Sequence, residues 1–164
     1  GMGLVGNMDL TDNMMLRSFR KGKTPFVNRK PSRKLAESVV KDLAVVTPGI
    51  TTPVRRLSGG NVQKVLLGRE IASSPTVLLT AYAVRGLDIN SSYTIYDLLN
   101  EQKKKGVAVI FVGEDLDVLM ELSDRIMVLC GGEVSGILDA RKTDKNEVGM
   151  LMTRVGGKEH EGKE

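Results

Sequence analysis

The hydrophobic pattern divides the chain into a helical first part and an alternating second part. In the first part, apolar residues recur at helical spacing and predict helices over residues 12–19, 32–46 and 60–74. Thr11 or Asp12 is expected to cap the first helix, and Ser32 the second. Prolines at 25, 31, 48, 53 and 75 separate these segments, because proline disrupts a helix interior.

After Pro75 the pattern predicts alternating strands and helices. Strands are expected at 77–80, 107–112, 125–129 and 133–138, and helices from Ser91 or Ser92 to Lys105, from Asp115 to Leu122 and over 144–153. The continuous apolar run at 107–112 is typical of a strand buried on both sides in a parallel sheet. Gly131-Gly132 predicts a tight hairpin turn. The predicted core includes Leu98, Leu99, Ile110 and Val112.

The fold class is therefore predicted to be α/β, with parallel strands, a C-terminal β-hairpin and an N-terminal helical subdomain. We expect a helical domain over residues 1–74, an α/β part over 75–153 and a disordered tail over 154–164.

Composition agrees with a globular chain. Of 164 residues, 41% are hydrophobic and 27% charged, which argues against disorder, and no apolar run approaches the roughly 20 residues of a membrane-spanning helix. No secretory signal is visible at the N-terminus. The single cysteine, Cys130, and the single histidine, His160, exclude a disulfide within the chain and a metal site built from several cysteines or histidines. No metal ligand is predicted.

A basic run occupies residues 17–41, with nine lysines and arginines against one acid, Glu37. Such a run could meet nucleic acid, acidic lipid or phosphate. The alternative is a solvated loop and helix face. The second interpretation is favoured, because no nucleic-acid motif accompanies the charges.

Two glycine patterns look like phosphate-binding loops and are not expected to be. The G-x-G-x-x-G over residues 1–6 has no strand before it. Gly22-Lys23-Thr24 lacks the first glycine of a P-loop, where Arg17 stands, and Pro25 follows where the phosphate-binding helix should begin. The chain therefore contains no Walker A motif.

The strongest chemical signal is the octapeptide Leu57-Ser58-Gly59-Gly60-Asn61-Val62-Gln63-Lys64. A serine hydroxyl and glycine amides at the start of a helix offer several donors to an anion, assisted by the positive end of the helix dipole. The structural alternative is that Ser58 only caps the helix while the glycines form a turn.

These eight residues resemble the signature motif of ATP-binding-cassette (ABC) ATPases, in the form found in bacterial importers of sugars and nucleosides. The similarity continues over residues 77–88, which align with the family's Walker B motif and D-loop, over 110–116, which align with the strand carrying the switch histidine, and over 122–126. Residues 3–13 resemble the segment after the glutamine loop. The resemblance covers residues 3–153 and implies that 1–74 is the helical signature subdomain and that 75–153 is the C-terminal part of a RecA-like P-loop NTPase core.

Three departures concern the hydrolytic centre. Ala81 stands where the family has the aspartate that supports Mg²⁺, Tyr82 where it has the glutamate that orients water, and Glu114 where it has the switch histidine. Phosphoryl transfer depends on positioning and on charge neutralisation. We therefore expect no catalytic residue in this chain and an inactive centre of its own.

The resemblance implies a shared ATP site. Two cassettes of this family close head to tail, so Ser58, Gly59, Gly60 and Asn61 would contact the γ-phosphate side and ribose of an ATP held by another cassette. Gly86 and Asp88 would form the D-loop contact across the same interface. ATP and Mg²⁺ are implied as cofactors of the full-length assembled protein, with none expected on this chain alone.

The implied setting is the cytoplasmic face of the inner membrane. The expected partners are a first nucleotide-binding cassette, transmembrane permease subunits and, indirectly, an extracytoplasmic solute-binding protein, with no nucleic acid. The chain is expected to be a fragment of the second, degenerate cassette. The sequence leaves sugar and nucleoside open as the solute, although residues 137–152 resemble the nucleoside branch more than the ribose type.

Two other functions are considered. One is the ABC-type ATPase head of a DNA-repair or chromosome-organising protein, in which the basic residues would meet DNA. The N-x-Q-K extension of the signature, the lack of coiled-coil heptads and the missing carboxylates argue against it. The other is a regulatory α/β domain that binds no nucleotide.

Overall fold

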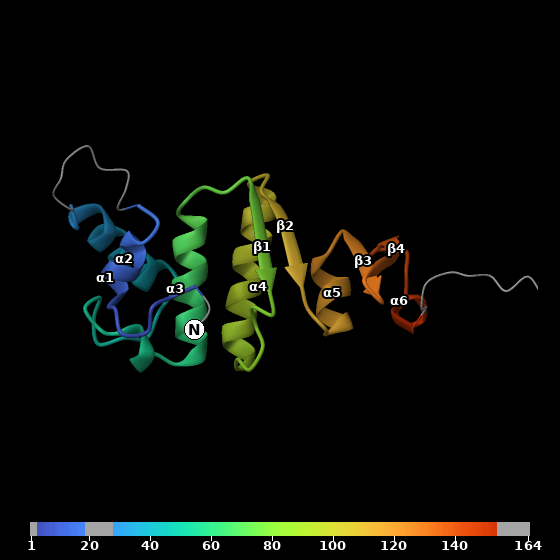
Figure 1. The fold of residues 1–164 in the computed structure, drawn as a ribbon, viewed down its shortest axis with the longest axis horizontal. Coiled ribbons are helices and arrows are strands. Elements are labelled where there is room, and N and C mark those ends of the chain that lie inside the picture. The colour runs from blue at the N-terminus through green and yellow to red at the C-terminus, as the bar shows by residue number, and fades with distance from the viewer. Residues whose placement is uncertain (1–2, 19–27, 154–164) are drawn as a thin grey trace, which may run out of the picture. The chain divides into compact units, whose positions relative to one another are not determined.

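The computed structural model describes residues 3–18 and 28–153. They divide into two compact units, Gly1–Ile110 and Phe111–Glu164, and each unit contains a hydrophobic cluster of its own. Figure 1 shows the order of the elements along the chain. The expected disordered tail from Arg154 lies outside the described residues. The predicted boundary near residue 74 falls in the connection between α3 and β1.

The first unit begins with a helical part. Its elements are α1 (Leu10–Met15), α2 (Lys30–Asp42), the short 3-10 helix η2 (Val54–Arg56) and α3 (Gly59–Ile71). These pack around one core in which Leu10 and Val65 are fully buried. The other buried members of this core are Leu4, Met14, Ala36, Val39, Val45 and Val54.

The boundaries of the first two helices differ from the prediction. Asp9, not Thr11 or Asp12, caps α1, because its carboxylate accepts a hydrogen bond from the Asp12 amide at 2.7 Å. Ser32 does not cap α2 but lies buried inside it, since Pro31 occupies the first turn, where proline is tolerated. The helix α2 ends at Asp42 rather than near residue 46, because Ala44 adopts a left-handed conformation with φ of 46°.

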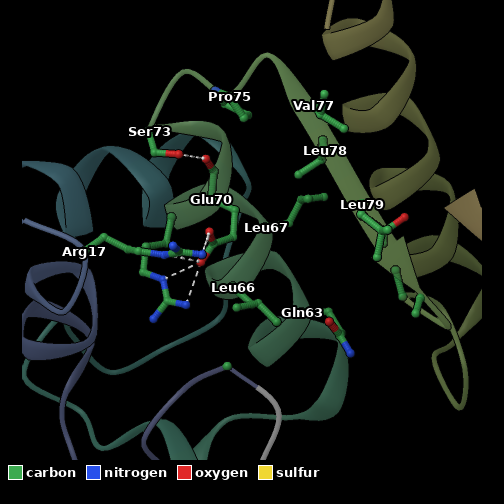
Figure 2. A pocket seen from close by; sticks show the side chains of 15 residues that line it. Arg17, Gln63, Leu66, Leu67, Glu70, Ser73, Pro75, Val77, Leu78 and Leu79 are labelled. Carbon is green, nitrogen blue, oxygen red and sulfur yellow. Dashed lines mark hydrogen bonds and ion pairs between the residues drawn. The ribbon is translucent and has the colours of Figure 1, made fainter. Parts of the chain in front are cut away.

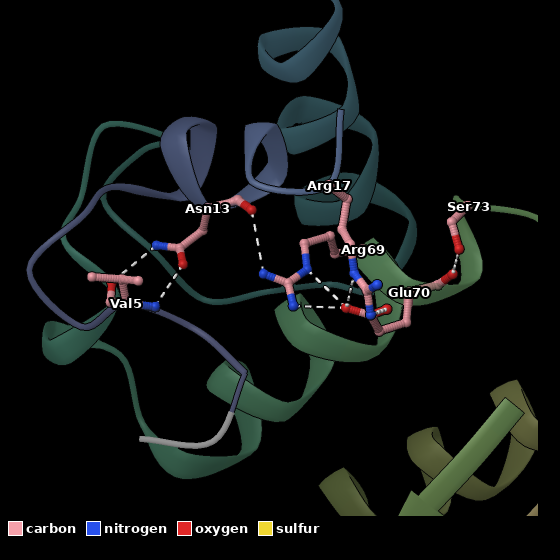
Figure 3. A network of polar contacts seen from close by, with 6 residues as sticks. All are labelled: Val5, Asn13, Arg17, Arg69, Glu70 and Ser73. Atoms are coloured by element: carbon pink, nitrogen blue, oxygen red, sulfur yellow. Dashed lines mark hydrogen bonds and ion pairs between the residues drawn. The ribbon is translucent and has the colours of Figure 1, made fainter. Parts of the chain in front are cut away.

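A polar network ties α1 to α3 inside this core (Figure 3). The fully buried Asn13 accepts a hydrogen bond from the Val5 amide at 2.8 Å, and its amide donates to carbonyls of the loop that precedes α1. The Arg69 guanidinium of α3 donates to the Asn13 carbonyl and to the Glu70 carboxylate. The network satisfies polar groups that burial would otherwise leave unpaired.

The alternating part of the first unit contains β1 (Val77–Ala81) and α4 (Ile89–Lys104), and β2 (Ala108–Val112) continues from it into the second unit. The strands β1 and β2 form a two-stranded sheet and run in the same direction (Figure 1). Along β1 exposure alternates: Leu78 and Thr80 are buried, whereas Val77 and Leu79 are 55% and 64% exposed.

This sheet corrects part of the predicted core. Leu99 is buried and Leu98 is half-buried, but Ile110 and Val112 are exposed. A strand is buried on both sides only where a layer covers each face of its sheet. In the part of the chain that the structure describes, one face of the β1–β2 pair is open, so the apolar run at 107–112 is not enclosed.

The second unit contains α5 (Leu116–Leu122), β3 (Arg125–Cys130), β4 (Glu133–Asp139) and α6 (Lys145–Thr153). As predicted, Asp115 caps α5 and the strands β3 and β4 form an antiparallel hairpin around Gly131-Gly132. Both glycines have positive φ, 60° and 87°, which the tight turn requires. The core lies between the hairpin and α6 and includes Ile126, Val128 and Val148.

Candidate functional site

Ser58 stands at the start of α3 with its side chain exposed. Its backbone is extended, and its hydroxyl makes no capping hydrogen bond to the helix. The alternative in which Ser58 only caps the helix is therefore not what the structure shows. Because the first amides of a helix have no carbonyl within the helix to bond, they point outward beside this hydroxyl.

Asn61 holds the Ser58 hydroxyl. The Asn61 amide nitrogen donates to Ser58 Oγ at 2.9 Å, and Asn61 Oδ1 accepts from the Val46 backbone amide at 3.0 Å. A serine hydroxyl carries one proton and two lone pairs. Since it accepts from Asn61, its proton remains available to donate to an anion in front of α3. Asn61 thus positions Ser58, a role that the sequence did not suggest.

Gly60 brings α3 against the start of α4. It is buried, and a Cβ at this position would lie 2.5 Å from Ser91 Oγ and 3.0 Å from Ser91 Cβ. The sequence suggested that the glycines allow close backbone approach to a phosphate. At Gly60 the close neighbour is the Ser91 side chain, which leaves no space for a side chain at residue 60. Gly59, in contrast, is exposed.

Asp88 caps α4. Its carboxylate accepts hydrogen bonds from the Ser91 amide at 2.9 Å and from the Ser91 hydroxyl at 2.7 Å. The Ser91 side chain, followed by the backbone amides, lowers the pKa of Asp88 below its ordinary value. The prediction that Ser91 or Ser92 caps this helix was wrong. The signal that could have found the true cap is the aspartate three residues before a serine at the helix start.

The structure therefore brings together the two predicted groups of site residues. Residues 58–61, called here the signature tip, lie beside the loop 82–88, because Gly59 faces Leu87 and Gly60 faces Ser91 and Asp88. Gly86 lies in this loop with φ of 74° and is exposed. That Ser58, Gly59, Gly60, Asn61, Gly86 and Asp88 contact ATP stays a prediction.

The end of β1 does not suit a magnesium ion. Mg²⁺ in phosphoryl-transfer sites is held by carboxylate and phosphate oxygens, but Ala81 presents a methyl group and Tyr82 a phenol. Tyr82 has φ of 53°, unusual for a bulky residue, and Arg85 lies 5.9 Å from the centre of its ring. Among the described residues there is no group of three or more His, Cys, Asp or Glu side chains that could hold a metal ion.

A cavity of about 560 Å³ lies between α3 and β1 (Figure 2). Leucines of both elements line it, together with Arg17, Arg69 and Glu70. Both guanidinium groups are bonded to the Glu70 carboxylate, so their charges are already compensated. We assign no ligand to this cavity.

The basic run is partly neutralised within the chain. Arg17 pairs with Glu70, Arg33 with Glu37, and Arg29 with Asp9 and Asp12. Its members Arg20, Lys21 and Lys23 lie outside the described residues.

Within the ranges that the structure describes, no helix is long and apolar enough to cross a membrane.

Comparison with known sequences identifies relatives of this chain. The xylose import ATP-binding protein XylG of Moorella thermoacetica is 35% identical over 156 residues, which are 95% of this chain and 31% of XylG. The galactose/methyl galactoside import ATP-binding protein MglA of Vibrio cholerae is 33% identical over 93% of this chain and 31% of MglA. MglA of Escherichia coli is 33% identical over 89% of this chain and 29% of MglA. The chain thus spans about a third of the curated relatives it matches.

Comparison with solved structures gives the same family. The ATP-binding cassette MJ0796, in a dimeric post-hydrolysis state bound to ADP and Pi, superposes with a TM-score of 0.71 at 25% identity, over 85% of this chain and 60% of that one. A nucleotide-free cassette from an ABC transporter gives a TM-score of 0.66 at 16% identity and supports the fold alone. No protein-family model matches the chain. Over the part that it spans, this chain is a homologue of ATP-binding proteins of sugar importers and has the α/β fold of an ABC ATPase cassette.

Proposed function

We propose that this chain supplies the signature tip to an ATP molecule held by another cassette in an ABC importer for sugars or nucleosides. The observation that carries the proposal is the exposed Ser58, whose hydroxyl accepts from Asn61 and keeps its proton for an anion in front of α3. The positive end of the α3 dipole favours the same ligand.

The chain's own hydrolytic centre is degenerate under this proposal. The positions after β1 that would support the metal and the attacking water carry Ala81 and Tyr82, and Glu114 adds a negative charge where a histidine would face the γ-phosphate. A cassette of this kind contributes to ATP turnover only through its partner's site.

The ligand is ATP with its Mg²⁺, both held by the partner's phosphate-binding loop. Ser58 and the first amides of α3 would hold the γ-phosphate side, while Gly86 and Asp88 belong to the loop that faces the partner. When bound, Mg²⁺ neutralises charge on the β- and γ-phosphates. The residues of this chain contribute donors and orientation, and they exclude water from the closed interface.

The wider setting follows from the same proposal. The partner cassette belongs to the same or another chain, permease subunits hold both cassettes at the cytoplasmic face of the inner membrane, and an extracytoplasmic protein delivers the solute. The names of the relatives, which describe import of xylose and galactose, favour a sugar over a nucleoside.

Ser58→Arg tests the proposal in the importer's assembled nucleotide-binding protein. A bulky cation at the signature tip is expected to block closure and abolish ATP turnover at the partner cassette. Ser38→Arg is the matched control, because Ser38 is an exposed serine on α2. Normal turnover in the Ser58→Arg protein would contradict the proposal.

Restoring the carboxylates tests the degenerate centre. The double variant Ala81→Asp, Tyr82→Glu of this chain alone is expected to release no phosphate from ATP, because the sequence has no phosphate-binding loop to support them. Phosphate release above that of the unmodified chain would show that the chain holds ATP by itself.

A further inference from the structure

Ser91 touches both groups of the predicted site at once. Its hydroxyl donates to the Asp88 carboxylate at 2.7 Å, and the same oxygen occupies the space that a Cβ of Gly60 would need, 2.5 Å away. Gly60 belongs to the signature tip at the start of α3, and Asp88 closes the loop 82–88 at the start of α4. One side chain therefore separates two helix starts that approach each other closely.

The close approach of the two helix starts leaves little space for a side chain at residue 60. Real Cβ atoms essentially never lie within 3.0 Å of another heavy atom, yet a side chain at residue 60 would meet both Ser91 Oγ and Ser91 Cβ at that distance or less. Ser91 has little freedom to move away, because its backbone amide and its hydroxyl are both bonded to Asp88. A shift of the signature tip toward α4 must therefore disturb the cap of α4.

We propose that Ser91 is a positioning residue that couples the signature tip to the loop 82–88, so that both surfaces offered to the partner cassette move as one body. The expected effect on ATP turnover rests on the proposed function. The contacts of Ser91 with residue 60 and with Asp88 do not depend on it. Ser91 itself touches no nucleotide. It acts by filling the space opposite Gly60 and by holding the Asp88 carboxylate.

A size-compensation experiment tests the coupling. In Gly60→Ala the new methyl group is expected to displace Ser91, whereas Ser91→Gly removes both atoms that the methyl group would meet and leaves the Asp88 carboxylate 3.7 Å away. The double variant Gly60→Ala, Ser91→Gly should therefore regain the packing that Gly60→Ala loses. Gly49→Ala is the matched control, because nothing lies within 4 Å of a Cβ at that position.

The readout in this chain is hydrogen exchange, measured by NMR, at the backbone amides of residues 62 and 91, which donate to the Ser58 carbonyl and to the Asp88 carboxylate. Helix propensity alone would make Gly60→Ala slow the exchange, since alanine has a higher helix propensity than glycine. The steric contact predicts the opposite sign: about tenfold faster exchange in Gly60→Ala, which corresponds to about 1.4 kcal/mol. In the double variant, exchange should return to within about twofold of the Ser91→Gly rate. Unchanged exchange in Gly60→Ala, or a double variant as fast as Gly60→Ala, would overturn the coupling.

A second readout separates this inference from the proposed function. In the assembled cassettes, ATP turnover at the partner should fall in Gly60→Ala and recover in the double variant. If the exchange rates show the coupling while neither Gly60→Ala nor Ser58→Arg lowers turnover, the proposed function fails and the role of Ser91 in the fold stands. If Ser58→Arg abolishes turnover but the double variant does not recover it, the proposed function stands and the positioning role of Ser91 is overturned.

Discussion

The side-chain amide of Asn61 donates a hydrogen bond of 2.9 Å to the hydroxyl of Ser58, one turn earlier in the chain. The other end of that amide accepts from the Val46 backbone, which anchors it to the segment after α2. The serine is thereby held as a donor toward the space in front of α3. In a cassette pair, this arrangement would present an oriented proton to phosphate.

Replacing Asn61 tests the orientation of Ser58. Asn61→Asp keeps an oxygen for the Val46 amide but removes the donor to Ser58, so the serine proton turns toward residue 61 and a negative charge faces the phosphate. We expect ATP-dependent association of this chain with a partner cassette to weaken at least about tenfold, which corresponds to about 1.4 kcal/mol. Light scattering or sedimentation measures the association.

Gln63→Glu is the control for that substitution, because it adds the same charge two residues further along α3 and leaves the contact between residues 58 and 61 in place. Equal loss of association in both variants would mean that charge alone acts, and that the hydrogen bond to Ser58 is without consequence.

The cap of α4 depends on pH. Hydrogen bonds from Ser91 lower the pKa of Asp88 below its ordinary value of 3.8, so the stabilisation is present above that value and is lost as the pH falls through the lower folded value. In Ser91→Ala the largest cause is removed, and the pKa of Asp88 is expected to rise toward 3.8. An NMR titration of the Asp88 carboxyl carbon measures it, with Asp88→Asn identifying the signal. An unchanged midpoint in Ser91→Ala would refute the contribution of the hydroxyl.

Asn13 is expected to be the most sensitive polar residue of the helical part. Its side chain is fully buried and bonds four backbone groups, at Val5, Met8 and Asp9. Asn13→Ala leaves these groups unpaired and should lower the free energy of unfolding by about 3 kcal/mol. Urea denaturation followed by circular dichroism measures the change. Asn90→Ala, at an exposed position, should stay within about 0.5 kcal/mol.

Ala44 offers a stabilising substitution. It is exposed and has φ of 46° just after α2, a conformation in which a Cβ costs about 1 kcal/mol. Ala44→Gly is therefore expected to raise the free energy of unfolding by about that amount. At Ala72, which follows α3 with φ of −63°, the same change should destabilise the chain. Thermal unfolding of both variants gives the comparison. If both substitutions changed the free energy of unfolding in the same direction, the energetic cost assigned to the left-handed conformation of Ala44 would be contradicted.

The sequence by itself determined the family, the α/β class and the position of the signature tip, because these depend on residue type and spacing that are visible along the chain. It also gave the β-hairpin, since Gly131-Gly132 dictates a tight turn locally. It also places Ala81 and Tyr82 directly after the apolar residues of the first strand, where the proposed function expects no carboxylate.

Only the tertiary structure decided which groups the residues of the candidate site contact. Asn61 is paired with Val46, fifteen residues earlier, and Gly60 with Ser91, on another helix. Burial likewise depends on layers: Ile110 is as apolar as Leu99, yet only Leu99 is covered. Periodicity reports which face of an element is apolar, but contacts between distant segments determine whether that face is buried and which polar group a side chain holds.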